Sequence, residues 1–185
     1  NIATDNGMIK PFIQEIELIK SEEEIHFNEL EVQIDAQYLS ALTEKDICQL
    51  TISVKQADET LVSDTMKLTA LAFDQWPGVL VNPELLASFV MPNHPVVNSM
   101  IQLASQYLDK WTKDPSLAGY QYGDPNRVKN MAAAAYAAIQ QKNITYAEPP
   151  SSFESSGQRI RLADAVLDQN LGTCMDMTLL YVACL

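Results

Sequence analysis

The segment from Gly172 to Leu185 constrains the fold most, because it begins with a turn and continues as a nearly unbroken apolar run. A glycine, a β-branched polar residue and then apolar side chains are typical of a loop that leads into a buried helix. Thr173 is suited to be the N-cap residue, which places Cys174 in the first helical turn with Asp176 close to it. We therefore predict that a helix starts at about Cys174 and lies in the centre of a domain.

Cys174 is a candidate nucleophile because of this predicted position. A thiol in the first turn of a helix lies close to unpaired backbone N–H groups and to the positive end of the helix dipole. Such surroundings lower the pKa of a cysteine and favour the thiolate, which is the nucleophilic form. A free cysteine can equally be a small buried apolar residue. The spacing of Cys174 alone leaves both interpretations open.

The residues around Cys174 resemble a known family. The stretch from Ile160 to Asp176 is similar to the core of the transglutaminase-like family, in which a short helix, a Gly-x-Cys-x-Asp turn and an apolar helix follow one another. Three further stretches, Leu71–Gly78, Met91–Pro95 and Gly157–Leu162, resemble one branch more closely. That branch is the N-terminal region of large bacterial superfamily-one helicase-like proteins, where a β domain and a transglutaminase-like domain precede the motor.

The resemblance implies an α+β fold in two parts. Residues 1–75 are expected to form an antiparallel β-sandwich, and residues 76–185 the mainly helical, N-terminal half of a transglutaminase-like fold. It also implies acyl transfer in the full-length protein, in which Cys174 attacks an amide carbonyl of a peptide or protein substrate, as in a protease, amidase or transglutaminase-like enzyme. Nearby polar residues are candidates for an oxyanion donor or for support, and the sequence does not choose among them: Gln158, Gln169, Asn170 and Asp176.

The catalytic histidine and acidic residue of this family lie after the cysteine helix, whereas His26 and His94 both precede it. We therefore expect a nucleophile without a general base, in a chain that is part of something larger. The apolar side chains of the last helix are predicted to lack cover and to favour self-association: Leu179, Leu180, Val182 and Leu185. The alternative function is a non-catalytic binding or scaffold module of a helicase-like protein, in which Cys174 only packs.

Composition excludes several other classes of function. The 185 residues carry 24 acidic and 12 basic side chains, a formal net charge of −12, so the chain is not expected to bind nucleic acid directly. No phosphate-binding glycine motif and no cysteine or histidine pair with zinc spacing is present, so no cofactor or metal is expected. Three widely spaced cysteines, Cys48, Cys174 and Cys184, fit a reducing, cytoplasmic setting. No apolar run reaches the length of a membrane span.

The spacing of apolar residues changes along the chain and divides it into a strand-forming part and a helical part. Alternation of apolar and polar residues predicts strands over Phe12–Lys20, Leu30–Ala36, Cys48–Val54 and Met66–Ala72, with a turn at Ala57–Thr60. After the boundary at Asp74–Gly78 the period becomes helical. Pro83, Val96 and Pro125 begin predicted helices, with a loop over Leu117–Asn126 and another over Pro149–Gly157. Asn82 is the predicted N-cap of the first helix, and His94 is a candidate N-cap of the second.

Overall fold

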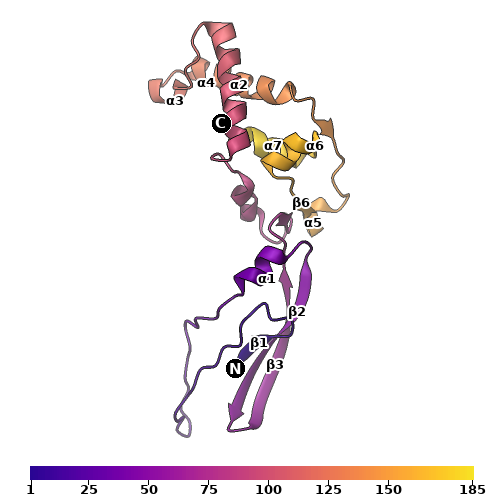
Figure 1. Ribbon diagram of the computed structural model, residues 1–185. Coiled ribbons are helices and arrows are strands. Elements are labelled where there is room, and N and C mark those ends of the chain that lie inside the picture. The colour runs from indigo at the N-terminus through magenta and orange to yellow at the C-terminus, as the bar shows by residue number, and fades with distance from the viewer. The chain divides into compact units, whose positions relative to one another are not determined.

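The computed structural model describes all residues, 1–185, and shows two compact units, Asn1–Phe73 and Asp74–Leu185 (Figure 1). The chain is 39% helix and 20% strand. The division between the units lies close to the change of apolar period at Asp74–Gly78. No helix combines the length and the apolar character that crossing a membrane requires.

The first unit is built on one antiparallel sheet with the strand order β1-β2-β3. β1 is Ile2–Thr4, and the long hairpin consists of β2 (Asp46–Gln56) and β3 (Glu59–Ala70). The alternation seen in the sequence explains the pairing, because Cys48 lies opposite Leu68 and Leu50 opposite Met66. The hairpin predicted from the sequence is confirmed.

The predicted strands over Phe12–Lys20 and Leu30–Ala36 are wrong. Only single bridges occur there, between Ile2 and Phe12 and between Ile9 and Ile34. A helix, α1 (Ala36–Ala41), begins where the second strand was expected to end, because the Asp35 carboxylate accepts hydrogen bonds from two amides of its first turn. Apolar and polar residues alternate in this segment, but the apolar ones do not form a buried face, since many of them stay exposed.

The predicted β-sandwich is likewise not formed, because residues 1–73 contain a single three-stranded sheet. One end of its apolar face is covered by α1 and by the segment that follows β1, rather than by a second sheet. The core residues there are small in number: Met8, Ile9, Cys48 and Ala70. The segment Leu30–Ile34 contributes one half-buried side chain, Val32, to this core.

The second unit is mainly helical. Its longer elements are η1 (Pro83–Phe89, a 3₁₀ helix), α2 (Pro95–Thr112), α4 (Pro125–Gln140), α6 (Ala163–Gln169) and α7 (Cys174–Ala183). The side chains of Asn82, His94 and Asp124 cap η1, α2 and α4, and a proline follows each cap, so these helix starts are confirmed. Two short helices, α3 (Gly119–Tyr122) and α5 (Phe153–Ser156), lie inside the two predicted loops.

Two short strand pairs bring distant segments to the start of α7. β4 (Gln75–Trp76) pairs antiparallel with β6 (Gln158–Arg159), and β5 (Thr145–Tyr146) pairs parallel with β7 (Leu171–Gly172). Tyr146 lies opposite Gly172 in this register. The segment that enters α7 is therefore held by residues from far back in the chain.

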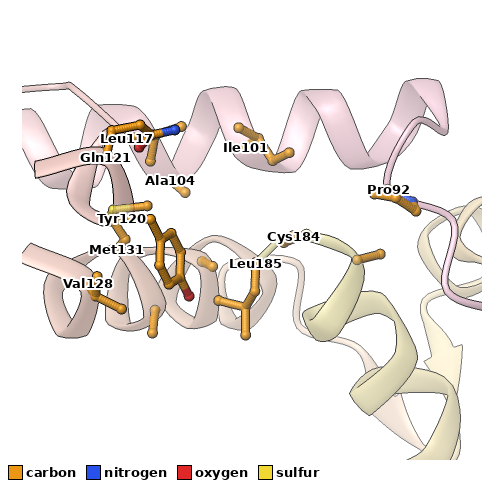
Figure 2. Close-up of a pocket in the computed structure, with 13 residues that line it drawn as sticks. Pro92, Ile101, Ala104, Leu117, Tyr120, Gln121, Val128, Met131, Cys184 and Leu185 are labelled. Carbon is orange, nitrogen blue, oxygen red and sulfur yellow. The ribbon is translucent and has the colours of Figure 1, made fainter. Parts of the chain in front are cut away.

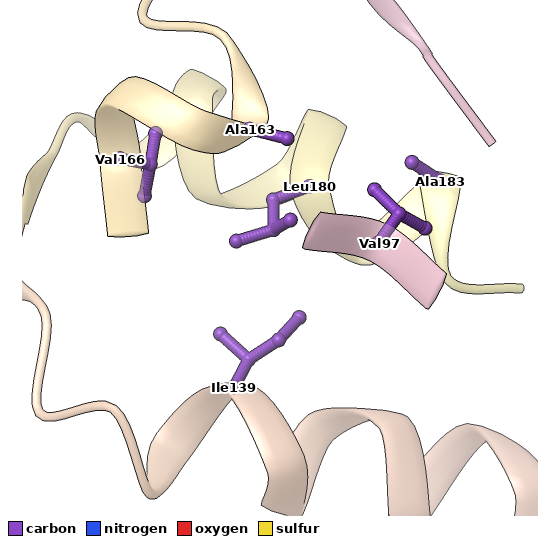
Figure 3. Close-up of a cluster of buried hydrophobic side chains, with 6 residues drawn as sticks. All are labelled: Val97, Ile139, Ala163, Val166, Leu180 and Ala183. Carbon is purple, nitrogen blue, oxygen red and sulfur yellow. The ribbon is translucent and has the colours of Figure 1, made fainter. Parts of the chain in front are cut away.

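The main core of the second unit joins four helices. Figure 3 shows side chains from α2, α4, α6 and α7 that point toward one another: Val97, Ile139, Ala163, Val166, Leu180 and Ala183. Leu179 is buried in a second cluster with Trp76 and Ile160. The prediction that Leu179 and Leu180 lack cover is therefore wrong, because helices that precede α7 in sequence supply it; Val182 and Leu185 remain exposed.

Candidate functional site

The start of α7 is fixed by a reciprocal pair of hydrogen bonds between Thr173 and Asp176. The amide of Asp176 donates to Thr173 Oγ1 at 3.2 Å, and the amide of Thr173 donates to Asp176 Oδ2 at 2.9 Å. This capping box satisfies the third amide of the helix and fixes the angle at which the chain enters it. The predicted N-cap at Thr173 and helix start at Cys174 are confirmed.

The Cys174 side chain is exposed at the first position of α7, whereas Cys48 is 1% exposed in the sheet core. Cys174 is therefore the more accessible of these two thiols. The backbone N–H groups of Cys174 and Met175 have no hydrogen-bond partner within the chain. The thiol therefore lies beside two free donors at the positive end of a helix, which is a setting that can bind a developing negative charge.

Asp176 is almost completely buried and its carboxylate is fully engaged. Besides the Thr173 amide, it accepts the Arg161 amide at 3.0 Å and forms an ion pair with the Arg161 guanidinium at 3.4 Å. These contacts connect α7 to the segment between β6 and α6. The three donors hold the buried carboxylate at the helix start, so the contacts of Asp176 are those of a residue that supports the site.

Gln158 is the candidate that the structure brings against the helix start. Its side chain is buried, and Nε2 donates to Thr173 Oγ1 at 3.3 Å. Gln158 Oε1 is buried and has no hydrogen-bond partner. The short β4–β6 pair holds this residue, with Gln158 opposite Trp76.

Gln169 and Asn170 are exposed at the C-terminal end of α6. Asn170 adopts the left-handed conformation that ends the helix, and its backbone carbonyl accepts from the amide of Thr145. Its role is to end α6 and begin the β5–β7 pair. Neither side chain has a hydrogen bond that directs it toward Cys174.

Tyr146 is the residue of the site that sequence reasoning missed. β5 places it beside the segment that enters α7, and burial followed by the neighbouring Cys174 thiol raises the pKa of its hydroxyl. The only signal in the sequence was that the alanine-rich helical pattern stops before the segment Asn143–Tyr146. Nothing in that pattern identified the tyrosine itself.

The two histidines have other surroundings. His94 Nδ1 accepts a hydrogen bond from the amide of Val96, so this side chain is the cap of α2. His26 belongs to the first unit, where its ring lies 3.4 Å from the carboxylate of Glu24 on the surface. Neither residue forms a described contact with the Cys174 thiol.

A pocket of about 340 Å³ lies at the other end of α7. Figure 2 shows it between α2, α4 and the end of α7, with Ile101, Tyr120, Met131 and Leu185 among its lining residues. A helix of ten residues is about 15 Å long, so this pocket is separate from Cys174. The candidate site is the exposed start of α7.

Comparison with models of protein families, with curated proteins and with solved structures found no match for the chain. The site is therefore defined by its geometry: an exposed thiol at a capped helix N-terminus, with a buried carboxamide and a phenol from two other segments beside it.

Proposed function

We propose that the second unit carries a thiol acyl-transfer site in which Cys174 is the nucleophile. The observation that carries the proposal is the exposed thiol at the first position of a helix whose start is fixed by the Thr173–Asp176 capping box. The thiolate attacks a carbonyl carbon, and the negative charge that develops on the carbonyl oxygen is stabilised by the free N–H of Cys174. The substrate class is a peptide or protein amide, and the unit is a transglutaminase-like domain of a larger, helicase-associated protein.

The general base belongs to another part of that larger protein in this proposal. His94 is engaged as a helix cap, and the resemblance to the transglutaminase-like family implies a histidine after the cysteine helix. A reducing compartment such as the cytoplasm is the setting in which this exposed thiol stays free. The acidic surface of the chain supports a protein substrate over a nucleic acid.

The test is labelling with a thiol-directed probe across pH, followed by peptide mapping. If the proposal is right, Cys174 reacts faster than an unstructured cysteine peptide at neutral pH, and Cys174→Ser removes the label without lowering the melting temperature. A labelling rate equal to that of the peptide at every pH would remove the physical basis of the proposal.

One observation favours the second candidate, a non-catalytic binding or scaffold module. The outer half of the β2–β3 hairpin carries exposed apolar side chains on one face, namely those of Ile52, Val54, Val62 and Met66. Exposed apolar groups that gather on one surface are typical of protein-binding sites. If the chain is only a scaffold, Cys174→Ser is silent in every functional assay, whereas Val54→Asp together with Val62→Asp abolishes partner binding.

A further inference from the structure

The pocket at the C-terminal end of α7 has no part in the proposed function of Cys174. Its volume is about 340 Å³, and its walls come from α2, from α3 and the residues before it, from α4 and from the end of α7 (Figure 2). Pockets that bind small molecules commonly have volumes of about 300–1,000 Å³ and mainly apolar walls. This pocket therefore has the size of a site for a small ligand.

The space exists because short side chains line it on two helices, and it is open to solvent. Ala104 of α2 and Ala132 of α4 lie at the pocket, whereas Met131 forms a longer apolar part of the wall. Tyr120 and Leu185 also line it, and these residues are 60% and 50% exposed. A small molecule can therefore reach the pocket without opening the core of the unit.

The walls carry no charged side chain, because none of the lining residues is Asp, Glu, Lys or Arg. Burial raises the pKa of Cys184 to about 11, so this thiol in the wall is neutral at pH 7. A charged ligand would give up part of its hydration and gain no opposite charge in return. The Tyr120 hydroxyl and the Gln121 carboxamide can each form a hydrogen bond with one neutral polar group of a ligand.

We propose that this pocket binds a neutral, largely apolar small molecule of about the size of two fused rings. The size follows from the volume, since an apolar cavity of about 150 Å³ in another protein holds benzene and this pocket has about twice that volume. The driving force is the removal of apolar surface from water. Because α7 separates the pocket from Cys174, the inference does not rest on the acyl-transfer proposal.

The first experiment is a calorimetric titration of the whole chain with two probes of similar shape. 2-Naphthalenemethanol is neutral, and 2-naphthoate is an anion of nearly the same size. The alcohol should bind with a Kd on the order of 100 µM, which is within the usual range for a ligand of about twelve non-hydrogen atoms. 2-Naphthoate should bind at least about 10-fold more weakly, because its charge has no partner in the pocket.

Two variants of α4 locate the binding site. Ala132→Phe places a ring in the pocket and should weaken binding of the alcohol by at least about 10-fold, because the ring takes up space that the ligand needs. Ala137→Phe is the matched control, since Ala137 is half-buried on the same helix, as Ala132 is, but does not line the pocket. Its Kd should stay within about two-fold of the wild type.

A measurement on the wild-type chain covers the case in which Ala132→Phe does not fold. Cys184 lines the pocket, and Cys174 lies at the other end of α7. At ten times the Kd, mass action leaves only about one pocket in ten empty, so the alcohol should slow alkylation of Cys184 by iodoacetamide at pH 9 by up to about 10-fold. Alkylation of Cys174 should not change. Peptide mapping reads both rates.

Four results would overturn the inference. One is the absence of saturable binding of the alcohol up to about 1 mM, and another is equal affinity for the alcohol and 2-naphthoate. Slower alkylation of Cys174 in place of Cys184 would locate the ligand elsewhere. A wild-type dimer in sedimentation that Ala132→Phe dissociates and Ala137→Phe does not would show that a second copy of the chain fills the pocket.

Discussion

The three thiols of the chain differ in exposure, and we predict that their reactivity follows the same order. At pH 8, iodoacetamide should modify Cys174 first, then Cys184 and last Cys48. Burial raises the pKa of Cys184 to about 11, so only about one molecule in a thousand carries the thiolate there at pH 8. Burial also raises the pKa of Cys48. Peptide mapping by mass spectrometry measures the three rates, and equal rates at Cys174 and Cys184 would contradict the prediction.

Gly157 is the glycine whose replacement should cost most. Its φ is +72°, and a Cβ there would lie 1.9 Å from the backbone oxygen of Trp76. A backbone atom cannot move aside as the end of a flexible side chain can. Gly157→Ala should therefore destabilise the second unit by about 3 kcal/mol and displace Gln158 with it. Gly123→Ala is the control, because Gly123 also has a positive φ but has open space around it, and about 1 kcal/mol is expected. Urea denaturation followed by tryptophan fluorescence measures both.

For single residues, the sequence predicted the capped start of α7 but did not predict the contacts that residues far away in sequence make there. Thr173, Cys174 and Asp176 are neighbours in sequence, so helix-capping rules predicted their arrangement. Tyr146 reaches the site through a parallel strand pair and Gln158 through an antiparallel one. Strands of two residues have no periodicity, so no pattern could predict either pairing.

Among the elements, α7 depends on a single buried carboxylate for its position. Asp176→Ala leaves the Thr173 amide, the Arg161 amide and the Arg161 guanidinium without their acceptor, so we expect a loss of about 3 kcal/mol in the free energy of unfolding. Asp168→Ala, at an exposed position of α6, should change it by less than about 0.5 kcal/mol. Equal effects of the two variants in urea denaturation would show that the capping box does not anchor the helix.

The contrast between confirmed helices and failed strands has a physical cause. Asn82, His94 and Asp124 each precede a proline, and an N-cap followed by proline is a local signal that needs no tertiary partner. A strand exists only if another strand pairs with it. Residues 12–20 and 30–36 alternate as strands do, but Asp35 caps α1, and the surrounding segment forms only single bridges.

At the scale of the whole molecule, the stability of the first unit should depend on pH through Tyr38 and Asp46. In the first unit the Tyr38 hydroxyl donates to Asp46, and Asn6 donates to the same carboxylate oxygen at 2.9 Å. The bond to Asp46 raises the pKa of Tyr38 to about 12, and the bond from Tyr38 lowers the pKa of Asp46. The stabilisation from Asp46 is complete above its unfolded pKa of about 4 and is lost as the pH falls through the lower folded value. The stabilisation from Tyr38 is complete below its unfolded pKa of about 10 and is lost as the pH rises toward 12.

We therefore predict a plateau of stability for the first unit between about pH 4 and pH 8; above it, loss of the contribution of Cys48, whose pKa burial also raises, comes first and that of Tyr38 follows. Hydrogen exchange of the β2 amides measures it, because residues 1–73 contain no tryptophan. Tyr38→Phe should lower the plateau and remove the part of the alkaline decline that this hydroxyl causes. An unchanged alkaline decline in Tyr38→Phe would show that another group is responsible.

The β4–β6 pair affects how the chain folds during translation on the ribosome. It joins the first residues of the second unit to residues that are translated only after α2 and α4 are complete. Until then the apolar faces of these helices that α6 and α7 later cover remain open to the surroundings. The hairpin of the first unit, by contrast, closes over a two-residue turn as soon as β3 has emerged. Nascent chains from which α2 and α4 have emerged but α6 and α7 have not should therefore recruit more chaperone than chains from which only the first unit has emerged.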